Sequence, residues 1–264
     1  MKSLTIIIPL YNEGERIVRT LNILKKGVHL PGLFLDQIIF IDDGSTDRTV
    51  KKLIAAKNAL KSALKTRVTI ISYSPNRGRG YAIRFGGLIS KSDYVLYIDG
   101  DLSIPLSNLK AFEKFISYKY DLIFGSKKKS GAKAVIPRSF LRKTVGYGHS
   151  FFASLVLGVF AWDYQGGFKL FSRKLIREIF PDLTIDRWGF DMEVIFLAKK
   201  LGYQSEEIPV VWSHFENGSK VKLLRDILRS VKEIFTIKYY WLMGRYTQSV
   251  PSISPTKVSA YSVY

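Results

Sequence analysis

Apolar and polar positions alternate in two patterns along the first half of the chain. Short continuous apolar runs, rich in Ile, Val, Leu and aromatic residues, predict buried strands at Leu4–Leu10, Gln37–Ile41, Val68–Tyr73, Tyr94–Ile98 and Asp121–Gly125. Longer amphipathic segments between them predict helices at about 13–27, 47–64, 79–90 and 106–117. This alternation predicts an α/β fold with a mostly parallel central sheet and helices on both faces.

The second half of the chain is less regular. Its pattern predicts a long helical stretch opened by Pro137, a strand at Gly166–Phe171, a helix at Gly189–Leu201 and a strand near Glu206–Val211. A long amphipathic C-terminal helix is expected at Val221–Met243. No internal repeat or linker separates the two halves, so we expect a single domain over residues 1–246 and a disordered tail at 247–264.

The chain is strongly basic. Forty-one Lys and Arg residues against 22 Asp and Glu residues leave a formal net charge of +19. Such a surplus indicates either a solvated basic surface or a polyanionic partner. The segment Leu122–Trp162 has no acidic residue but seven basic ones: Lys127, Lys128, Lys129, Lys133, Arg138, Arg142 and Lys143. Aromatic residues lie in apolar runs rather than between basic residues, so we expect no nucleic-acid partner.

Cysteine is absent, which excludes a disulfide framework, a thiolate metal site and a cysteine nucleophile. No charged-then-apolar leader precedes the first predicted strand, so we expect a cytoplasmic protein. The segment Thr144–Trp162 is uncharged over 19 residues, but only Phe151–Trp162 is strongly apolar. Because that length is short for a bilayer span, the pattern favours a buried or interfacial helix.

Acidic residues follow two of the predicted strands. Asp42 and Asp43 come after Gln37–Ile41, and Asp99-Gly100-Asp101 comes after Tyr94–Ile98. Packing explains such carboxylates poorly, because a buried charge is costly unless it is paired or bound to a metal. Mg²⁺ or Mn²⁺ is often held by one or two carboxylates together with phosphate oxygens, and it neutralises charge on a leaving diphosphate. An ordinary loop or capping role is the alternative.

Two further loops carry groups suited to a nucleotide. In Pro9-Leu10-Tyr11-Asn12-Glu13, Tyr11 can stack on a base and Glu13 can accept from a ribose, although the segment also fits a helix-capping turn. In Asn76-Arg77-Gly78-Arg79-Gly80, the glycines allow close approach of the backbone to a phosphate, and the arginines supply bidentate donors.

The motifs P-L-Y-N-E, D-D-G-S-T-D-R-T, N-R-G-R-G and D-G-D-L-S occur in this order between residues 9 and 103. Together they resemble family 2 glycosyltransferases of GT-A fold. The later motifs at 163–171, 187–193 and 216–220 are similar to those of dolichyl-phosphate β-glucosyltransferases, and less closely to those of dolichyl-phosphate mannose synthases. The resemblance covers roughly residues 4–220 and implies metal-dependent, inverting transfer from a nucleotide-sugar donor. The Q-x-x-R-W motif of processive synthases is absent, which favours transfer of one sugar.

The resemblance also implies roles for individual residues. The donor-binding set is Pro9, Tyr11, Glu13, Ile41, Asp43, Arg77, Arg79, Asp99, Gly100 and Asp101. Asp99 and Asp101 would bind Mg²⁺ or Mn²⁺. The acceptor-binding set is Lys127, Arg138, Arg142, Gln165 and Lys220. Asp101 and Asp191 are the expected catalytic residues. Asp191 would be either a general base or a positioning group, because an ionised phosphate acceptor hardly needs a base.

The second-half motifs favour UDP-glucose as donor and a polyprenyl or dolichyl phosphate as acceptor; GDP-mannose, or a hydroxyl on protein or glycan, is the alternative. Residues 1–125 would form the donor-binding half, 126–220 the acceptor-binding half and 221–246 a membrane-interface helix. In that helix Lys222, Arg225, Arg229 and Lys232 form one stripe, and aliphatic residues fill another face. A basic amphipathic helix of this kind predicts peripheral attachment to the anionic, cytoplasmic face of a membrane.

Overall fold

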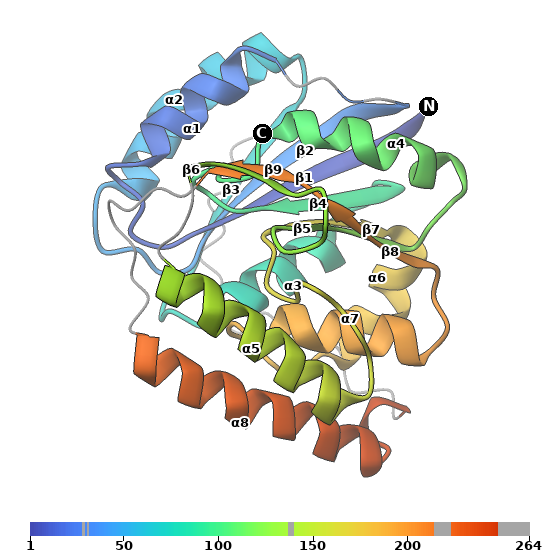
Figure 1. The fold of residues 1–264 in the computed structure, drawn as a ribbon. Helices are drawn as coiled ribbons and strands as arrows, with labels where there is room; N and C mark the ends of the chain where they lie inside the picture. The colour runs from blue at the N-terminus through green and yellow to red at the C-terminus, as the bar shows by residue number, and fades with distance from the viewer. Residues whose placement is uncertain (28–29, 31, 137–139, 214–222, 248–264) are drawn as a thin grey trace.

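The structure, a computed structural model, describes residues 1–27, 30, 32–136, 140–213 and 223–247. Its centre is a seven-stranded sheet (Figure 1) made of β1 (Lys2–Leu10), β2 (Leu33–Asp42), β3 (Arg67–Ser72), β4 (Tyr94–Ile98), β5 (Leu122–Ser126), β7 (Phe168–Ser172) and β8 (Ser205–Pro209). The strand order is β3-β2-β1-β4-β7-β5-β8, and only β7 is antiparallel to its neighbours. The predicted α/β fold with a mostly parallel sheet is confirmed.

Helices cover both faces of this sheet (Figure 1). One layer holds α1 (Ile17–Lys25), α2 (Thr49–Leu64) and α4 (Leu109–Ser117), which follows the 3₁₀ turn η1 (Leu106–Asn108). The other holds α3 (Arg79–Ile89), α5 (Phe140–Leu157), α6 (Arg173–Ile179), α7 (Phe190–Lys200) and α8 (Leu223–Leu242), with the 3₁₀ turns η2 (Phe180–Asp182) and η3 (Arg245–Thr247). Strands from both halves of the chain therefore share one sheet.

Two hydrophobic cores explain the continuous apolar runs of the central strands. Ile6 and Ile8 of β1 face the core under α1 and α2, whereas Ile7 faces the core under α3 and α7. The same alternation places Phe40 of β2 in the first core and Ile41 in the second. A strand that is covered on both faces needs apolar side chains on both, so the continuous runs of the sequence follow from this layering.

Several predicted boundaries are wrong, and hydrogen bonds explain one of them. The first helix begins at Ile17 rather than near residue 13, because the Glu13 and Gly14 N–H groups donate to Thr49 Oγ1 and Asp47 Oδ2 at 2.8 and 2.9 Å. β1 ends at Leu10, as predicted, and begins two residues earlier than expected, at Lys2. The two short strands of a second sheet, β6 (Lys133–Ile136) and β9 (Val211–Ser213), were not expected from the apolar pattern.

Helices α5 and α8 lie side by side (Figure 1) and contact each other through side chains. His149 Nε2 and Ser230 Oγ are 2.6 Å apart, and the rings of Phe152 and Phe235 meet edge to face. The predicted aliphatic face of the last helix is divided: Ile234 is fully buried in the core, whereas Phe235 is 53% exposed. Among the described residues, no helix combines the length and the apolar content that a bilayer crossing requires.

Glu233 of α8 is a partly buried acid, and the shift of its pKa predicts that the stability of the protein depends on pH. Burial raises the pKa of its carboxyl to about 7, although the Gly189 N–H and the Arg229 and Arg187 charges oppose the rise. The folded chain therefore holds a proton that the unfolded chain has released, and the stabilisation that this proton provides is lost as the pH rises through about 7.

We expect the melting temperature of the Glu233→Gln variant to exceed that of the wild type at about pH 8, and to fall less between about pH 5 and pH 8. The neutral amide removes the cost of a buried anion. Thermal melts of Glu233→Gln, the wild type and Glu113→Gln, which changes an exposed acid on α4, provide the comparison. If the melting temperatures of all three proteins show the same pH dependence, Glu233 has no part in it.

Candidate functional site

The carboxyl ends of three neighbouring parallel strands meet at one edge of the sheet. In the register of the central pairs, Leu10 of β1 lies opposite Asp42 of β2, and Ile7 of β1 lies opposite Tyr97 of β4. The acidic motifs follow directly, as Asp43 after β2 and Asp99-Gly100-Asp101 after β4. The structure thus brings the predicted polar motifs together where α/β sheets usually bind ligands.

The two aspartates of the D-x-D motif have different surroundings. Asp99 Oδ1 accepts from Tyr97 Oη at 2.7 Å and from Arg79 Nη1 at 3.3 Å. Asp101 Oδ1 accepts from the Ser103 N–H at 2.8 Å, and no described residue donates to its Oδ2. Gly100 lies between them, where a Cβ would come within 2.6 Å of Leu10 Cδ2. Asp101 therefore keeps one oxygen without a donor among the described residues, whereas Asp99 is already paired with a cation.

A buried cluster of charged side chains lies next to Asp99. Asp191, at the start of α7, has both oxygens occupied: Lys169 Nζ of β7 lies 2.7 Å from Oδ1, and Arg79 Nη2 of α3 binds Oδ2. Both Asp191 and Lys169 are completely buried. Burial alone would lower the pKa of Arg79, but the negative charges of Asp191 and Asp99 hold that pKa above its ordinary value. Both oxygens of Asp191 are thus engaged in ion pairs, which fits the expected positioning role more closely than the expected role as a general base.

Trp188 and Tyr97 complete the surroundings of Arg79. The guanidinium carbon of Arg79 lies 4.2 Å from the Trp188 ring centroid and 5.6 Å from that of Tyr97. A guanidinium over an aromatic face is stabilised by the ring quadrupole, and its planar orientation is restricted. Arg79 is therefore a fixed donor beside the D-x-D motif rather than a mobile surface residue.

Asp43 holds the loop that carries the arginines. Its Oδ1 accepts from the Arg77 N–H at 2.7 Å, and its Oδ2 accepts from the Gly78 N–H and from Asn76 Nδ2, both at 2.8 Å. Burial raises the pKa of Asp43, and these backbone hydrogen bonds oppose the rise. Because the loop uses both oxygens, the carboxylate of Asp43 anchors Arg77 and Arg79 instead of facing open space.

The glycines of the same loop allow close packing against the chain before α7. A Cβ on Gly78 would lie 2.5 Å from the Asp186 carbonyl oxygen, and one on Gly80 would lie 2.5 Å from Phe190 Cβ. The chain before α7 occupies the space that a side chain would need. The sequence signal was therefore correct in requiring glycine, and the approach of a phosphate to this backbone stays a prediction.

The remaining donor-side residues differ in accessibility. Ile41 corrects the prediction, since its side chain is fully buried and its Cδ1 packs where a Cβ of Gly86 on α3 would lie. Pro9 is also buried within β1. Glu13 accepts from Arg16 Nε at 2.7 Å, so its carboxylate is paired. Tyr11, the residue after β1, is 39% exposed.

On the acceptor side, Lys127 lies next to the D-x-D turn. Its Nζ is 3.4 Å from Ser103 Oγ, and its N–H donates to Asp163 Oδ2 at 3.0 Å. Gln165 is half-buried in the turn before β7. Arg138 and Lys220, and the side chain of Arg142, lie outside the described residues.

Lys128 and Lys129, next in the basic segment, are used inside the fold. Lys128 Nζ contacts Gly146 O and Ser150 Oγ, both at 2.7 Å, and Asp163 Oδ1 at 3.4 Å. Lys129 pairs with Glu206 at 3.1 Å. The acid-free segment therefore contributes only part of its charge to a ligand surface.

Lys169, Trp188 and Gly167 are site residues that the sequence interpretation missed. The carbonyl of Gly167 accepts from the Asp99 N–H at 3.2 Å, and a Cβ on Gly167 would overlap the Asp99 carboxylate. A lysine inside the apolar run of β7 was a visible signal, because a buried cation needs a buried anion. Which anion it meets depends on the antiparallel insertion of β7 beside β4.

The D-x-D motif fits a hard divalent cation that is bound jointly with a nucleotide. Among the described residues, no three His, Cys, Asp or Glu side chains gather to hold a metal. Asp101 offers Oδ2, and Asp99 stands one residue away with its carboxylate against Gly167. One or two carboxylates together with phosphate oxygens and water form a usual Mg²⁺ coordination set.

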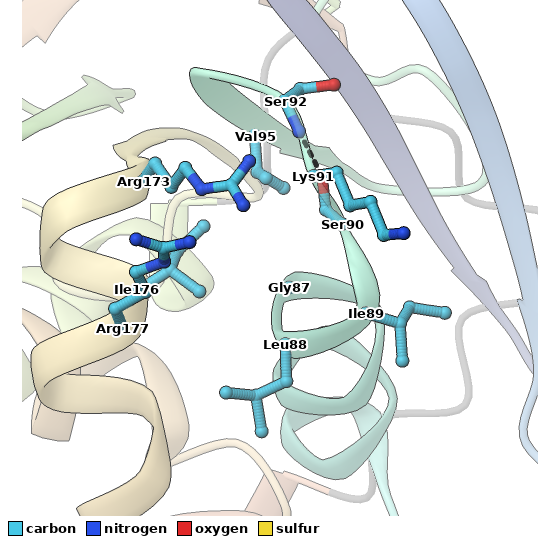
Figure 2. Close-up of a pocket in the computed structure, with 10 residues that line it drawn as sticks. All are labelled: Gly87, Leu88, Ile89, Ser90, Lys91, Ser92, Val95, Arg173, Ile176 and Arg177. Atoms are coloured by element: carbon cyan, nitrogen blue, oxygen red, sulfur yellow. Dashed lines mark hydrogen bonds between the residues drawn. The ribbon is translucent and has the colours of Figure 1, made fainter.

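A separate cavity of about 230 Å³ lies between α3 and α6. Figure 2 shows its lining, which includes Lys91, Arg173 and Arg177 and, at the start of β4, Val95. Ser92 N donates to Ser90 Oγ on its rim. Because the cavity lies at the amino end of β4, it is at the sheet edge opposite to the D-x-D motif.

Comparison with known proteins agrees with this arrangement. The family model of glycosyl transferase family 2 matches residues 5–180. The dolichyl-phosphate β-glucosyltransferase of Saccharomyces cerevisiae is 34% identical over 92% of this chain and 76% of its own length. The enzyme of the same name from Dictyostelium discoideum is 32% identical over 91% of this chain and 75% of its own length.

A solved structure of Mycobacterium tuberculosis glucosyl-3-phosphoglycerate synthase, in complex with Mn²⁺, UDP and glucosyl-3-phosphoglycerate, has a similar fold. Its TM-score is 0.63 at 17% identity, and the match covers 96% of this chain and 82% of that one. This likeness confirms the predicted GT-A architecture. With the family match over most of the sheet and its strand-end acids, the chain belongs to glycosyl transferase family 2 and is a glycosyltransferase.

Proposed function

We propose that this protein transfers one glucose from UDP-glucose to a polyprenyl or dolichyl phosphate, with inversion at the anomeric carbon. The observation that carries the choice of acceptor is the state of Asp191, whose two oxygens are bound by Lys169 and Arg79. A hydroxyl acceptor needs a base to remove its proton, whereas a phosphate oxygen is largely ionised near neutral pH. The names of the relatives that are 30–34% identical support the same acceptor and sugar.

The donor diphosphate belongs at the D-x-D motif. Asp101, with Asp99, would hold Mg²⁺ or Mn²⁺ together with phosphate oxygens, and the metal supplies charge neutralisation for the departing diphosphate when it is bound. Arg79 lies beside Asp99 at 3.3 Å and adds a fixed cationic donor for the same charge. Tyr11 at the end of β1 offers an aromatic face for the base. Mn²⁺ and UDP in the solved structure of the mycobacterial synthase support this arrangement.

The acceptor phosphate belongs beside Lys127. The ammonium of Lys127 lies near Ser103, whose N–H binds Asp101, so a phosphate held there would be close to the anomeric carbon of a donor at the D-x-D motif. Lys127 also lies 5.6 Å from the Trp212 ring, which limits its range of orientations. Gln165, Arg138, Arg142 and Lys220 remain predicted contacts of the acceptor.

We further propose peripheral attachment to the cytoplasmic face of a membrane through α5 and α8. Phe151 and Leu155 of α5 are 72% and 71% exposed, one helical turn apart. On α8 the exposed apolar residues fall on one stripe, at Leu228, Phe235, Tyr239 and Leu242. Apolar side chains of this number on two adjacent helices favour a lipid interface, and the net charge of +19 favours anionic headgroups.

The acceptor assignment is tested with two lipids that differ only in the phosphate. We expect glucose transfer from UDP-glucose to dolichyl phosphate and none above background to dolichol, measured by extraction of labelled lipid. Lys127→Gln should raise the acceptor KM about 10-fold with little change in donor KM, because it removes a charge-assisted contact. Lys133→Gln, an exposed lysine of β6, is the matched control. Transfer to dolichol, or to a protein or glycan hydroxyl instead of the phosphate, would contradict the proposal.

The metal assignment predicts loss of turnover in Asp101→Asn. The amide keeps the size of the side chain and its contact with Ser103 but removes the charge that binds a hard cation. We expect turnover to fall by about 10²-fold or more, and the melting temperature to stay near the wild-type value. Turnover is measured with added Mg²⁺ or Mn²⁺ and with EDTA. Near-normal turnover of the variant, or wild-type activity in EDTA, would remove the metal from the site.

The membrane assignment predicts that wild-type protein floats with anionic liposomes and that the double variant Phe151→Ser, Leu155→Ser does so about 10-fold less. Each exposed side chain contributes roughly 1.5–3 kcal/mol on full burial in an apolar phase. Phe34→Ser, which changes an exposed phenylalanine of β2 in the central sheet, is the control. Flotation should weaken at high salt. Equal flotation of all three proteins would exclude α5 from the interface.

A further inference from the structure

The loop formed by residues 183–189, between η2 and α7, links the active-site arginine to the C-terminal part of the chain. Its Trp188 ring covers the guanidinium of Arg79 at 4.2 Å. Its Asp186 carbonyl accepts from the Tyr81 N–H at 3.0 Å, and the Asp186 carboxylate pairs with Arg84 at 2.8 Å. The 183–189 loop therefore lies directly on the first turns of α3, and its position determines where Trp188 meets Arg79.

Glu193 of α7 binds the start of this loop through hydrogen bonds. The carboxylate is fully buried and accepts from Thr184 N at 3.0 Å, from Thr184 Oγ1 at 2.6 Å and from Ile185 N at 2.9 Å. Burial raises the pKa of Glu193, and these donors, together with Tyr246, oppose the rise. Glu193 thus supplies acceptors to two backbone N–H groups at the base of the loop.

The C-terminal chain completes the same set of donors. Tyr246, in η3 after α8, donates its hydroxyl to Glu193 Oε1 at 2.8 Å and is 5% exposed. Its ring lies 6.4 Å from that of Tyr240 on α8. A second contact comes from Glu233 of α8, which packs so closely on Gly189 that a Cβ there would be 2.8 Å from Glu233 Oε2. The end of α8 and η3 therefore holds the 183–189 loop at both of its ends.

We infer that Tyr246 and Glu193 are positioning residues for glycosyl transfer, acting through the 183–189 loop and Trp188 on Arg79. The inference rests on the proposed role of Arg79 at the donor diphosphate. The guanidinium of Arg79 contacts Asp191, Asp99 and the rings of Trp188 and Tyr97, and of these residues only Trp188 lies on the 183–189 loop. Release of the loop would leave the ion pairs in place and remove the aromatic wall that limits the guanidinium's orientation. The same contacts join the proposed membrane helix to the active site.

The test compares Tyr246→Phe with Tyr203→Phe. Both substitutions keep the aromatic ring and remove one hydrogen bond from a tyrosine hydroxyl to a glutamate, but the partner of Tyr203 is Glu178 on α6, away from the 183–189 loop. We expect Tyr246→Phe to lower kcat about 10-fold with donor KM within about twofold, because alignment is lost in the transition state more than in the bound donor. Tyr203→Phe should keep the wild-type kcat.

A double-mutant cycle and hydrogen exchange identify the route of the effect. In a Trp188→Phe background, Tyr246→Phe should cost less than about twofold in kcat, because the two changes act through one contact. Amide exchange of residues 184 and 185 should be faster in Tyr246→Phe than in the wild type and unchanged in Tyr203→Phe.

Unchanged exchange, or additive losses with Trp188→Phe, would overturn the inference. The exchange measurement needs no substrate. If the wild type fails to glucosylate dolichyl phosphate, the proposed function fails while exchange at residues 184 and 185 still decides whether Tyr246 holds the loop.

Discussion

The site depends on one buried electrostatic arrangement, the pairing of Asp191 with Lys169 and Arg79. Four charges lie in contact when Asp99 is included, and they sum to zero. A buried carboxylate with two cationic partners is stable only because every charge has a partner and the geometry is held by the fold. The four side chains come from β7, α3, the end of β4 and α7, so the arrangement requires the order of strands β4-β7-β5 and the two helices packed on them. Loss of any one of the four would leave the cluster with a net charge.

This arrangement also supports the chemistry that we propose for the site. Because Asp191 is fully used in holding Arg79 and Lys169, the proposed reaction takes its nucleophile from an acceptor that already carries negative charge. The protein then has to supply charge neutralisation and alignment rather than proton transfer. Asp101, Arg79 and Lys127 lie around one turn after β4 and offer these functions.

The basic character of the chain is divided between structure and surface. Lys128 and Lys169 are cations used inside the fold, where they bind Asp163 and Asp191. The apolar residues of α8 are likewise divided between core and surface. Ile234 and Ile237 are buried in the core, whereas Phe235 and Tyr239 are exposed. A helix that is held by the core on one side can contact a membrane only with the other. The side of α8 that faces the core reaches the 183–189 loop through Glu233, which packs against Gly189.

The sequence by itself determined the fold class, the strand ends and the identity of the acidic motifs. Those features follow from local patterns: apolar runs that are covered on both faces, and carboxylates placed directly after them. Glycine motifs were recognised as well, but Gly78 and Gly80 make room for residues 185–190, which are about a hundred positions away. Only the tertiary structure decided that Asp43 anchors a loop, that Ile41 is a core residue and that Asp191 meets Lys169. These contacts join segments that are distant in the sequence. The residues on either side of a position do not indicate which distant side chain will pack against it.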